Sequence, residues 1–262
     1  AQVRQKALDK LVELKKYTIE PFKFAISGSG ALGLCEQGEL PFVQEVFASA
    51  TGVSKLYPET DCAIELGGED AKILFFQGSV EQRMNSTCAG GTGAFIDQMS
   101  TLLNMSLEEM NEASLNYHRL YPIASRCGVF AKTDIQPLIN QGVDKCDLCA
   151  SIFQAVVDQT ITSLAQGRKI EGNILFLGGP LYFLSGLRKR FVETLKLSDA
   201  QVNCPETAIN FVALGTAICA DQEYTYDELY KVLEDLVHAP AKLTESKPLF
   251  ESEEDYQKFI ER

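Results

Sequence analysis

The chain has 262 residues, and its 36 acidic and 24 basic side chains give a formal net charge of −12. A composition of 45% hydrophobic and 23% charged residues is typical of a globular protein with one large domain or two small ones. The acidic balance argues against a nucleic-acid surface, and the sequence shows neither an apolar run of bilayer length nor a signal-peptide pattern. We therefore expect a cytoplasmic protein that binds neither nucleic acid nor membrane.

Apolar residues at helical spacing predict a helix over residues 1–16, which begins without a cap, as the interior of a longer protein would. A strand is expected over residues 22–27, with the turn Ser27-Gly-Ser-Gly30 at its carboxyl end. Ligands bind at such ends in open α/β sheets, although a plain strand-to-helix turn is an equal alternative for this motif alone. The next expected helix covers residues 42–50.

Three short strands are predicted over residues 61–66, 71–76 and 80–84, in a meander. The first turn of this meander contains Gly67 and Gly68 together with three carboxylates, those of Glu65, Glu69 and Asp70. Like charges at this density need a cation or a hydrogen-bond network. Flexible backbone N–H donors beside carboxylates suit a phosphate and its Mg²⁺, which prefers oxygen ligands.

A cysteine in a glycine-rich turn, Cys88, precedes an amphipathic helix expected over residues 91–103. Three glycines allow a tight turn with outward N–H groups, and the helix adds the positive end of its dipole. Such a field lowers the pKa of a thiol and makes it a better metal ligand or nucleophile. Cys127 has an equivalent setting, because a short polar turn containing Arg126 precedes the helix expected over residues 127–139.

The other six cysteines are scattered along the chain, and most of them are expected to be small buried hydrophobes. Cys146 and Cys149 have the CxxC spacing of zinc and redox sites. No second pair accompanies them, and they share one face of an expected helix. Packing is therefore favoured over ligation for this pair.

A long helix is expected over residues 148–166, and a buried strand over 173–177 ends in Gly178-Gly179-Pro180 before another helix. A short strand is expected at 201–203. Small residues in the helix over 205–220, at positions 213, 215 and 217, allow close packing. After residue 222 the chain is acidic and without strand signals, with a helix at 226–237, a proline-containing linker and a polar end.

The predicted elements resemble the actin-like ATPase fold, an α/β fold of ribonuclease H-like type. The resemblance lies in their order: a strand, an acidic Gly-Gly turn, a meander, a glycine-rich helix start and a second strand-Gly-Gly-helix unit. The second phosphate loop of this fold is similar to residues 65–70, and its adenosine loop is similar to residues 176–181. Two further motifs, Cys88-Ala-Gly-Gly-Thr-Gly93 and Arg126-Cys-Gly-Val-Phe-Ala-Lys132, are similar to the cysteine motifs of one family. That family comprises the activators of 2-hydroxyacyl-CoA dehydratases and the benzoyl-CoA reductase ATPases, of BadF/BadG/BcrA/BcrD type.

The resemblance implies an ATP-dependent activator that passes a low-potential electron from a donor such as ferredoxin or flavodoxin to a dehydratase. It also implies a homodimer that shares one 4Fe-4S cluster, with Cys88 and Cys127 of each subunit as ligands; such clusters are held by four thiolates. The catalytic positions fall on Glu65 and Glu69, where the family usually has Asp and Gln. ATP or ADP with Mg²⁺ is expected at the glycine turns, namely Gly67, Gly68, Gly90, Gly91, Thr92, Gly93, Gly178 and Gly179.

The family's first phosphate loop has no counterpart in the sequence, so we expect an actin-like domain over residues 1–222 that is incomplete at its N-terminus and binds nucleotide weakly. Residues 223–262 are expected to be an acidic helical extension, as in an excised domain of a large double-domain activase. Whether this piece retains ATPase activity stays open. The alternative is a degenerate actin-like module that binds nucleotide or partners without redox chemistry, with its cysteines merely buried.

Overall fold

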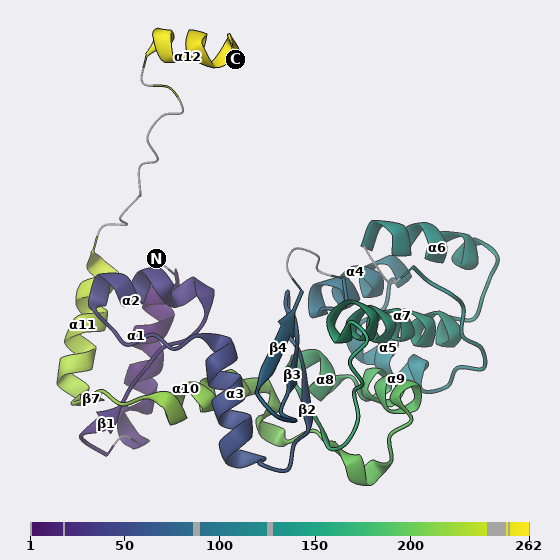
Figure 1. The fold of residues 1–262 in the computed structure, drawn as a ribbon, viewed down its shortest axis with the longest axis horizontal. Coiled ribbons are helices and arrows are strands. Elements are labelled where there is room, and N and C mark those ends of the chain that lie inside the picture. The colour runs from purple at the N-terminus through teal and green to yellow at the C-terminus, as the bar shows by residue number, and fades with distance from the viewer. Residues whose placement is uncertain are drawn as a thin grey trace. The chain divides into compact units, whose positions relative to one another are not determined.

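A computed structural model of the chain describes residues 2–17, 19–85, 90–124, 128–239, 250 and 252–261. These residues form two compact units (Figure 1). The larger unit comprises residues 23–29 and 41–222, and the smaller unit comprises residues 1–22, 30–40 and 223–262. The expected division into 1–222 and 223–262 stays a prediction.

A five-stranded sheet in the order β4-β3-β2-β5-β6 organises the larger unit. Its strands are β2 (Cys62–Leu66), β3 (Ala71–Phe75), β4 (Glu81–Met84), β5 (Ile174–Leu177) and β6 (Val202–Asn203). β2, β3 and β4 form the predicted antiparallel meander, whereas β5 runs parallel to both β2 and β6. Because β2 and β5 are parallel neighbours with Glu65 opposite Leu177, their carboxyl ends meet at one edge of the sheet. The Gly-Gly turns that follow these two strands are thereby brought side by side.

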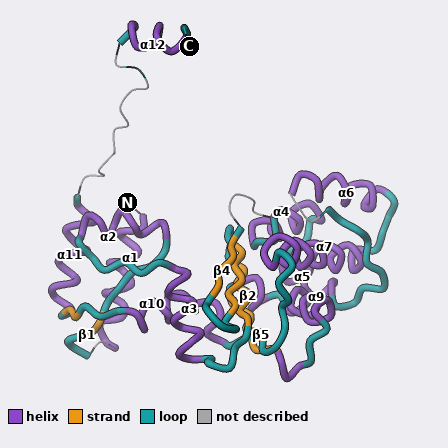
Figure 2. The backbone as a smooth tube through the Cα atoms, viewed as in Figure 1, coloured by secondary structure: helices purple, strands orange, loops and turns teal. Residues whose placement is uncertain are grey.

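Helices cover both faces of this sheet (Figure 2). One face buries Ile64, Leu66 and Phe176 in the main core, which is completed by the helices α4 (Gly93–Leu103), α5 (Leu107–Ser114), α6 (Gly128–Asn140), α7 (Lys145–Thr160) and α9 (Ser185–Leu195). The other face buries Ala63 and Leu175 against α3 (Glu45–Leu56) and α10 (Phe211–Cys219). Short α8 (Gly179–Phe183) begins directly after β5. Shorter helical turns lie at Ser29–Ala31, Ile161–Ala165, Asp199–Gln201 and Glu206–Asn210.

α7 is long and apolar, and it continues without a break into the helical turn that ends at Ala165. The 21 residues from Lys145 to Ala165 have the length and composition of a membrane span, so the expectation that no apolar run reaches this length is wrong. Two thirds of its most apolar window, 67%, is buried inside the structure. This burial is that of a core helix, and its apolar residues pack in the main core.

α3 and α10 cross at two glycines. A Cβ atom on Gly215 would lie 2.1 Å from the carbonyl oxygen of Ala48, and a Cβ atom on Gly52 would lie 3.1 Å from the ring of Phe211. The predicted close approach at position 215 is therefore confirmed. Backbone-to-backbone contact of this kind leaves no room for a side chain at the crossing.

We expect Gly215→Ala to lower the free energy of unfolding by about 1–3 kcal/mol, because the added methyl group forces two helix backbones apart. Gly33→Ala is the matched control, since a Cβ atom at Gly33 would meet nothing within 4 Å. That change should be neutral or stabilising by up to about 1 kcal/mol. Urea unfolding of the three proteins measures both effects, and equal behaviour of the two variants would contradict the packing described.

The smaller unit is helical. It contains α1 (Gln2–Leu14) and its terminal turn Lys15–Tyr17, α2 (Leu32–Gly38), α11 (Tyr226–His238) and α12 (Glu253–Ile260). The two-residue strands β1 (Phe22–Lys23) and β7 (Glu223–Tyr224) pair with each other. The guanidinium group of Arg4 on α1 donates to the carbonyl oxygens of Leu236 and Ala239, both at 2.8 Å, and thereby fastens α1 to the end of α11.

One expectation about the elements is wrong, and one helix was missed. The strand predicted over residues 22–27 is reduced to β1 and a single bridge between Ile26 and Phe42, because the chain turns at Gly28, where φ is 100°. α2 was not predicted, and α12 lies in the part that was expected as the polar end of the helical extension. α6 contains Pro137 and ends at Asn140, close to the expected helix over residues 127–139. The expected linker falls mainly on residues 240–249, which lie outside the described residues.

Candidate functional site

The turn between β2 and β3 presents glycine backbone at the edge where the parallel strands end. The N–H group of Gly67 donates to the carbonyl oxygen of Asp70 at 2.7 Å and closes the turn. A Cβ atom on Gly68 would meet nothing within 4 Å, and the backbone at Gly68 is not in the left-handed region. Local strain therefore does not demand glycine at this position, and the space beside it admits a ligand to the backbone.

The start of α4 is docked directly on this turn. The N–H groups of Gly93 and Ala94 donate to the carbonyl oxygens of Gly67 and Gly68 at 2.9 and 2.7 Å. A Cβ atom on Gly93 would lie 3.2 Å from Cα of Gly68 and 3.4 Å from the ring of Pro180. The three predicted glycine segments thus meet at one place, although the first N–H groups of α4 are used by the turn and are not free for a ligand.

The Gly-Gly-Pro segment after β5 forms the opposite wall. Gly178 has a φ of 88°, and a Cβ atom on it would lie 2.0 Å from the carbonyl oxygen of Leu66, so only glycine fits there. Its N–H group donates to the carbonyl oxygen of Ala208 at 3.0 Å. Next to it, a Cβ atom on Gly179 would meet nothing within 4 Å. Gly179 and Gly68 therefore both have open space beside them.

The remaining predicted cofactor residues lie deeper in the unit. Gly90, Gly91 and Thr92 are buried, and Thr92 is 0% exposed. A Cβ atom on Gly91 would lie 3.3 Å from the side chain of Gln159 and 3.4 Å from that of Thr160, both on α7. This segment therefore packs the start of α4 against α7.

A cavity of about 540 Å³ opens beside Gly179. α4 contributes Asp97 to its lining, α5 contributes Glu108 and Glu112, and α8 contributes Phe183. The lining is completed by Leu107, Asn111, Pro180 and Leu184. Phe183 is 66% exposed, so its ring is available for stacking, and the carboxylates offer hydrogen-bond acceptors. The volume and the mixed lining are those of a small-ligand site.

The two acids predicted to be catalytic lie in different surroundings. Glu65 is 7% exposed; one of its carboxylate oxygens accepts a hydrogen bond from Ser49 at 2.9 Å, and the other accepts from the Lys72 ammonium at 3.2 Å. Lys72 also donates to Glu45 at 3.0 Å. Glu69, by contrast, is exposed at the turn, where its carboxylate can bind a hydrated cation or accept a proton.

Lys72 is the buried cation between these carboxylates. Burial lowers the pKa of Lys72, but the charges of Glu65 and Glu45 and their hydrogen bonds outweigh burial, so the pKa is raised above its ordinary value. Lys72 therefore stays charged and neutralises acids that would otherwise repel an anionic ligand at the turn. Sequence reasoning missed this residue, although its position opposite Glu65 in the β2–β3 hairpin was a usable signal.

Both cysteines predicted to hold a metal, Cys88 and Cys127, lie outside the described residues. The helices that follow them are described and are packed together. A Cβ atom on Gly128, the first residue of α6, would lie 2.9 Å from the side-chain oxygen of Gln98 and 3.8 Å from the ring of Phe95. The position directly after Cys127 therefore contacts the first two turns of α4.

The described cysteines have the character of packing residues. Burial raises the pKa of Cys62 and of Cys149 to about 12, and Cys149 is 0% exposed with its sulfur 3.9 Å from that of Met105. Burial, followed by the nearby Asp144 carboxylate, also raises the pKa of Cys146. Within the described part of the chain, no group of three or more His, Cys, Asp or Glu side chains is placed to hold a metal ion.

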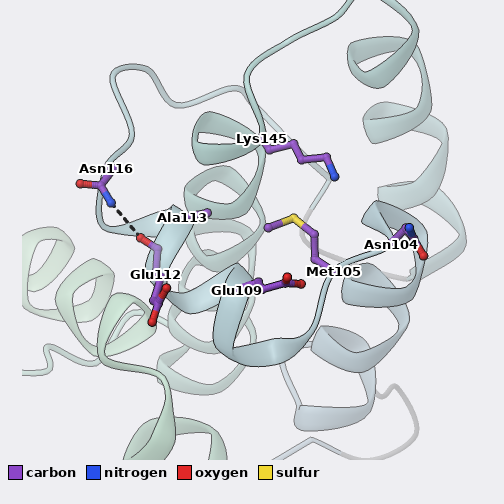
Figure 3. Close-up of a pocket in the computed structure, with 7 residues that line it drawn as sticks. All are labelled: Asn104, Met105, Glu109, Glu112, Ala113, Asn116 and Lys145. Atoms are coloured by element: carbon purple, nitrogen blue, oxygen red, sulfur yellow. Dashed lines mark hydrogen bonds between the residues drawn. The ribbon is translucent and has the colours of Figure 1, made fainter.

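A second pocket, of about 440 Å³, also borders α5, through Glu109, Glu112 and Ala113 (Figure 3). Its lining mixes Lys145 with Glu109, Glu112 and two amide side chains. The amide of Asn116 donates to the carbonyl oxygen of Glu112 at 3.1 Å, and the Lys145 ammonium donates to that of Leu103 at 3.3 Å. These polar groups already have partners on the protein, and the pocket contains none of the glycine turns.

The adjoining ends of parallel strands, the meeting glycine segments and the cavity beside them define a nucleotide-binding protein of the actin-like ATPase class. The chain belongs to the BadF/BadG/BcrA/BcrD ATPase family, whose family model matches residues 2–220. Family and fold class are both as predicted from the cysteine and glycine motifs.

Individual relatives support the same classification. The chain is 26% identical over 209 residues to the 2-hydroxyisocaproyl-CoA dehydratase activator of Clostridioides difficile. The matched region covers 79% of this chain and 74% of the relative. The crystal structure of component A of the (R)-2-hydroxyglutaryl-CoA dehydratase of Acidaminococcus fermentans matches with a TM-score of 0.68 and 26% identity, over 81% of this chain and 77% of that one. The Clostridium difficile activator solved with bound ADPNP shares the fold, with a TM-score of 0.70 and 24% identity over 92% of this chain and 85% of that one.

Proposed function

We propose that this chain is the nucleotide-binding domain of an ATP-dependent activator that delivers a low-potential electron to a 2-hydroxyacyl-CoA dehydratase-type enzyme. The observation that carries the proposal is the meeting of Gly68, Gly93 and Gly179 beside a cavity large enough for a nucleoside. The acceptor enzyme is proposed from the family and from relatives that are named as dehydratase activators. The protein would act in the cytoplasm, as a homodimer, with ferredoxin or flavodoxin as electron donor.

The nucleotide is proposed to bind with its phosphates at the open backbone of Gly68 and Gly179. The nucleoside would then enter the adjoining cavity, where Glu108 and Glu112 can accept hydrogen bonds from ribose hydroxyls and Phe183 can cover the base. Mg²⁺ fits the oxygen-rich side of the same turn, because Glu69 is exposed there and Lys72 already neutralises Glu65.

The 4Fe-4S cluster is proposed to be held by Cys88 and Cys127 of two subunits. In support, Gly128 contacts Gln98 and Phe95, so the helix starts that follow the two cysteine segments are neighbours. When bound, such a cluster supplies one-electron transfer, and the protein tunes its potential through nearby dipoles and burial. The chain's own contribution would be two thiolates and two helix N-termini, whose positive ends favour added negative charge.

Gly68→Val is the direct test of the nucleotide site. The branched side chain would fill the space beside the turn, and we expect at least about a tenfold loss of affinity for ATP with Mg²⁺. Since a Cβ atom at position 68 would meet no protein atom within 4 Å, the free energy of unfolding should change by less than about 0.5 kcal/mol. Calorimetric titration and urea unfolding measure the two quantities.

Gly33→Val is the control for this test, because it adds the same side chain at another open glycine, in α2. It should leave the affinity of the chain for ATP unchanged. Unaltered affinity in Gly68→Val would contradict the proposed phosphate position. Equal losses in both variants would show that the effect is not local to the turn.

A further inference from the structure

Hydrogen bonds hold the turn between β2 and β3 from two sides. Gly93 and Ala94 of α4 donate to the carbonyl oxygens of Gly67 and Gly68, as described above. On the other side, the turn is bonded to Asn85, the residue directly after β4. The turn thus lies between two anchors that are separated along the chain by fewer than ten residues.

Asn85 makes three bonds to the far end of the turn. Its backbone N–H donates to the carbonyl oxygen of Ala71 at 3.1 Å, its side-chain oxygen accepts from the N–H of Ala71 at 2.8 Å, and its side-chain amide donates to the carbonyl oxygen of Glu69 at 3.4 Å. In the first two bonds, Asn85 donates to Ala71 and Ala71 donates back to Asn85, as the two residues of a hydrogen-bonded pair in an antiparallel ladder do.

The side chain of Asn85 therefore takes the place of a backbone carbonyl. The last pair of the β3–β4 ladder is Lys72 with Met84, and Ala71 with Asn85 would be the next pair in this register. In a regular ladder the N–H of Ala71 would bond the backbone carbonyl of that residue. Because the side-chain oxygen accepts this bond instead, the main chain can leave the sheet after Asn85 while the turn keeps its partner.

We infer that Asn85 is the positioning residue that holds the Gly67–Ala71 turn in the conformation that presents the backbone of Gly68 to a bound phosphate. The inference rests on the proposed function, since the phosphate is that of the proposed nucleotide. A ligand that shifts or stiffens the turn acts on Gly93 through one anchor and on Asn85 through the other. Without the side chain of Asn85, the turn keeps its bonds to α4 but loses two of the three bonds that oppose its movement at the other end.

Asn85→Ala tests this assignment by amide hydrogen exchange, with ADP and Mg²⁺ as the probe. Without nucleotide, the variant should exchange about tenfold faster at residues 68–71, as expected for two lost hydrogen bonds of ordinary strength. With ADP, the wild-type protein should gain protection both at the turn and at residues 90–94, because Gly93 and Ala94 are bonded to the turn. In the variant, ADP with Mg²⁺ should bind about tenfold more weakly in a calorimetric titration, because binding must first order the loosened turn.

Two further variants separate positioning from a general structural role. Asn85→Asp keeps the acceptor for Ala71 and should restore most of the protection at the turn without nucleotide and most of the ADP affinity. Asn116→Ala removes a side-chain bond to a backbone carbonyl in the second pocket and should leave both segments unchanged. Equal ADP affinity of wild type and Asn85→Ala would overturn the inference, as would unchanged exchange at the turn without nucleotide. A wild-type protein that does not bind ADP would instead contradict the proposed nucleotide site, and the exchange without nucleotide would still decide the role of Asn85.

Discussion

Replacing Lys72 with methionine is expected to lower the free energy of unfolding of the larger unit by about 3–5 kcal/mol. The side chain of Lys72 is 5% exposed and lies 3.2 Å from a carboxylate oxygen of Glu65, whose side chain is 10% exposed. Removing the ammonium group leaves the Glu65 carboxylate buried without its countercharge, with the Ser49 hydroxyl as its remaining side-chain partner among the described residues. Urea unfolding of the variant measures the loss.

Two controls define the cause of this loss. The double variant Lys72→Met with Glu65→Gln removes both charges and keeps an acceptor for Ser49, so it should recover most of the stability. Lys10→Met breaks the ion pair between Lys10 and Glu13, whose side chains are 64% and 61% exposed. This variant should lower the free energy of unfolding by less than about 1 kcal/mol. A double variant as unstable as Lys72→Met alone would show that packing rather than charge explains the effect.

The pH dependence of the same pair has a definite sign. Because the pKa of Lys72 is raised in the folded protein above its ordinary value of 10.5, the folded state binds this proton more tightly than the unfolded state. The stabilisation is therefore complete below about pH 10.5 and is lost as the pH rises through the folded-state pKa. The difference in stability between wild type and double variant should narrow only in that alkaline range.

The double variant also separates two roles for Glu65. If Glu65 takes part in catalysis, as the resemblance implies, the refolded double variant should bind ATP and fail to hydrolyse it. If its function is to hold Lys72 and Ser49, hydrolysis should be retained, with Glu69 as the exposed acid at the turn.

The sheet and the meeting of the glycine turns could be predicted because both depend on local patterns. Runs of buried residues with flanking glycines mark β2 and β5, and parallel pairing brings the ends of such strands to one edge. The order of the motifs along the chain then indicated which turns meet. Of the predicted set, Gly68 and Gly179 have open space beside them at the meeting point, and Gly93 bonds the start of α4 to the turn.

The parts that escaped prediction are set by packing between distant segments. α5 shows only a capping box and an apolar stripe in the sequence, and nothing local indicates that Glu108 and Phe183 line one cavity. Glu45 reaches Lys72 from α3, 27 residues earlier. α2 contains Gly33 and Gly38, which weaken a helix prediction, yet Gly38 is packed against Leu236 in the same unit.

Cys88→Ser and Cys127→Ser are each expected to remove the iron and to shift the protein from dimer to monomer. If two subunits hold one cluster with two thiolates each, the cluster is part of a two-fold interface, and iron binding and assembly are linked equilibria. Loss of a single ligand type removes two of the four thiolates. Iron and sulfide assays with analytical ultracentrifugation, on protein purified without oxygen, measure both effects.

Cys146→Ser is the matched control, because it removes a thiol whose pKa is raised first by burial and then by Asp144, and which is therefore a poor thiolate ligand. This variant should retain both iron and dimer. Iron that persists in Cys88→Ser and Cys127→Ser, or that is lost in Cys146→Ser, would contradict the ligand assignment. Absence of iron from every anaerobically purified protein, with ATP binding intact, would favour the actin-like module without redox chemistry, since cysteines that serve only for packing affect stability in proportion to their burial and leave the oligomeric state unchanged.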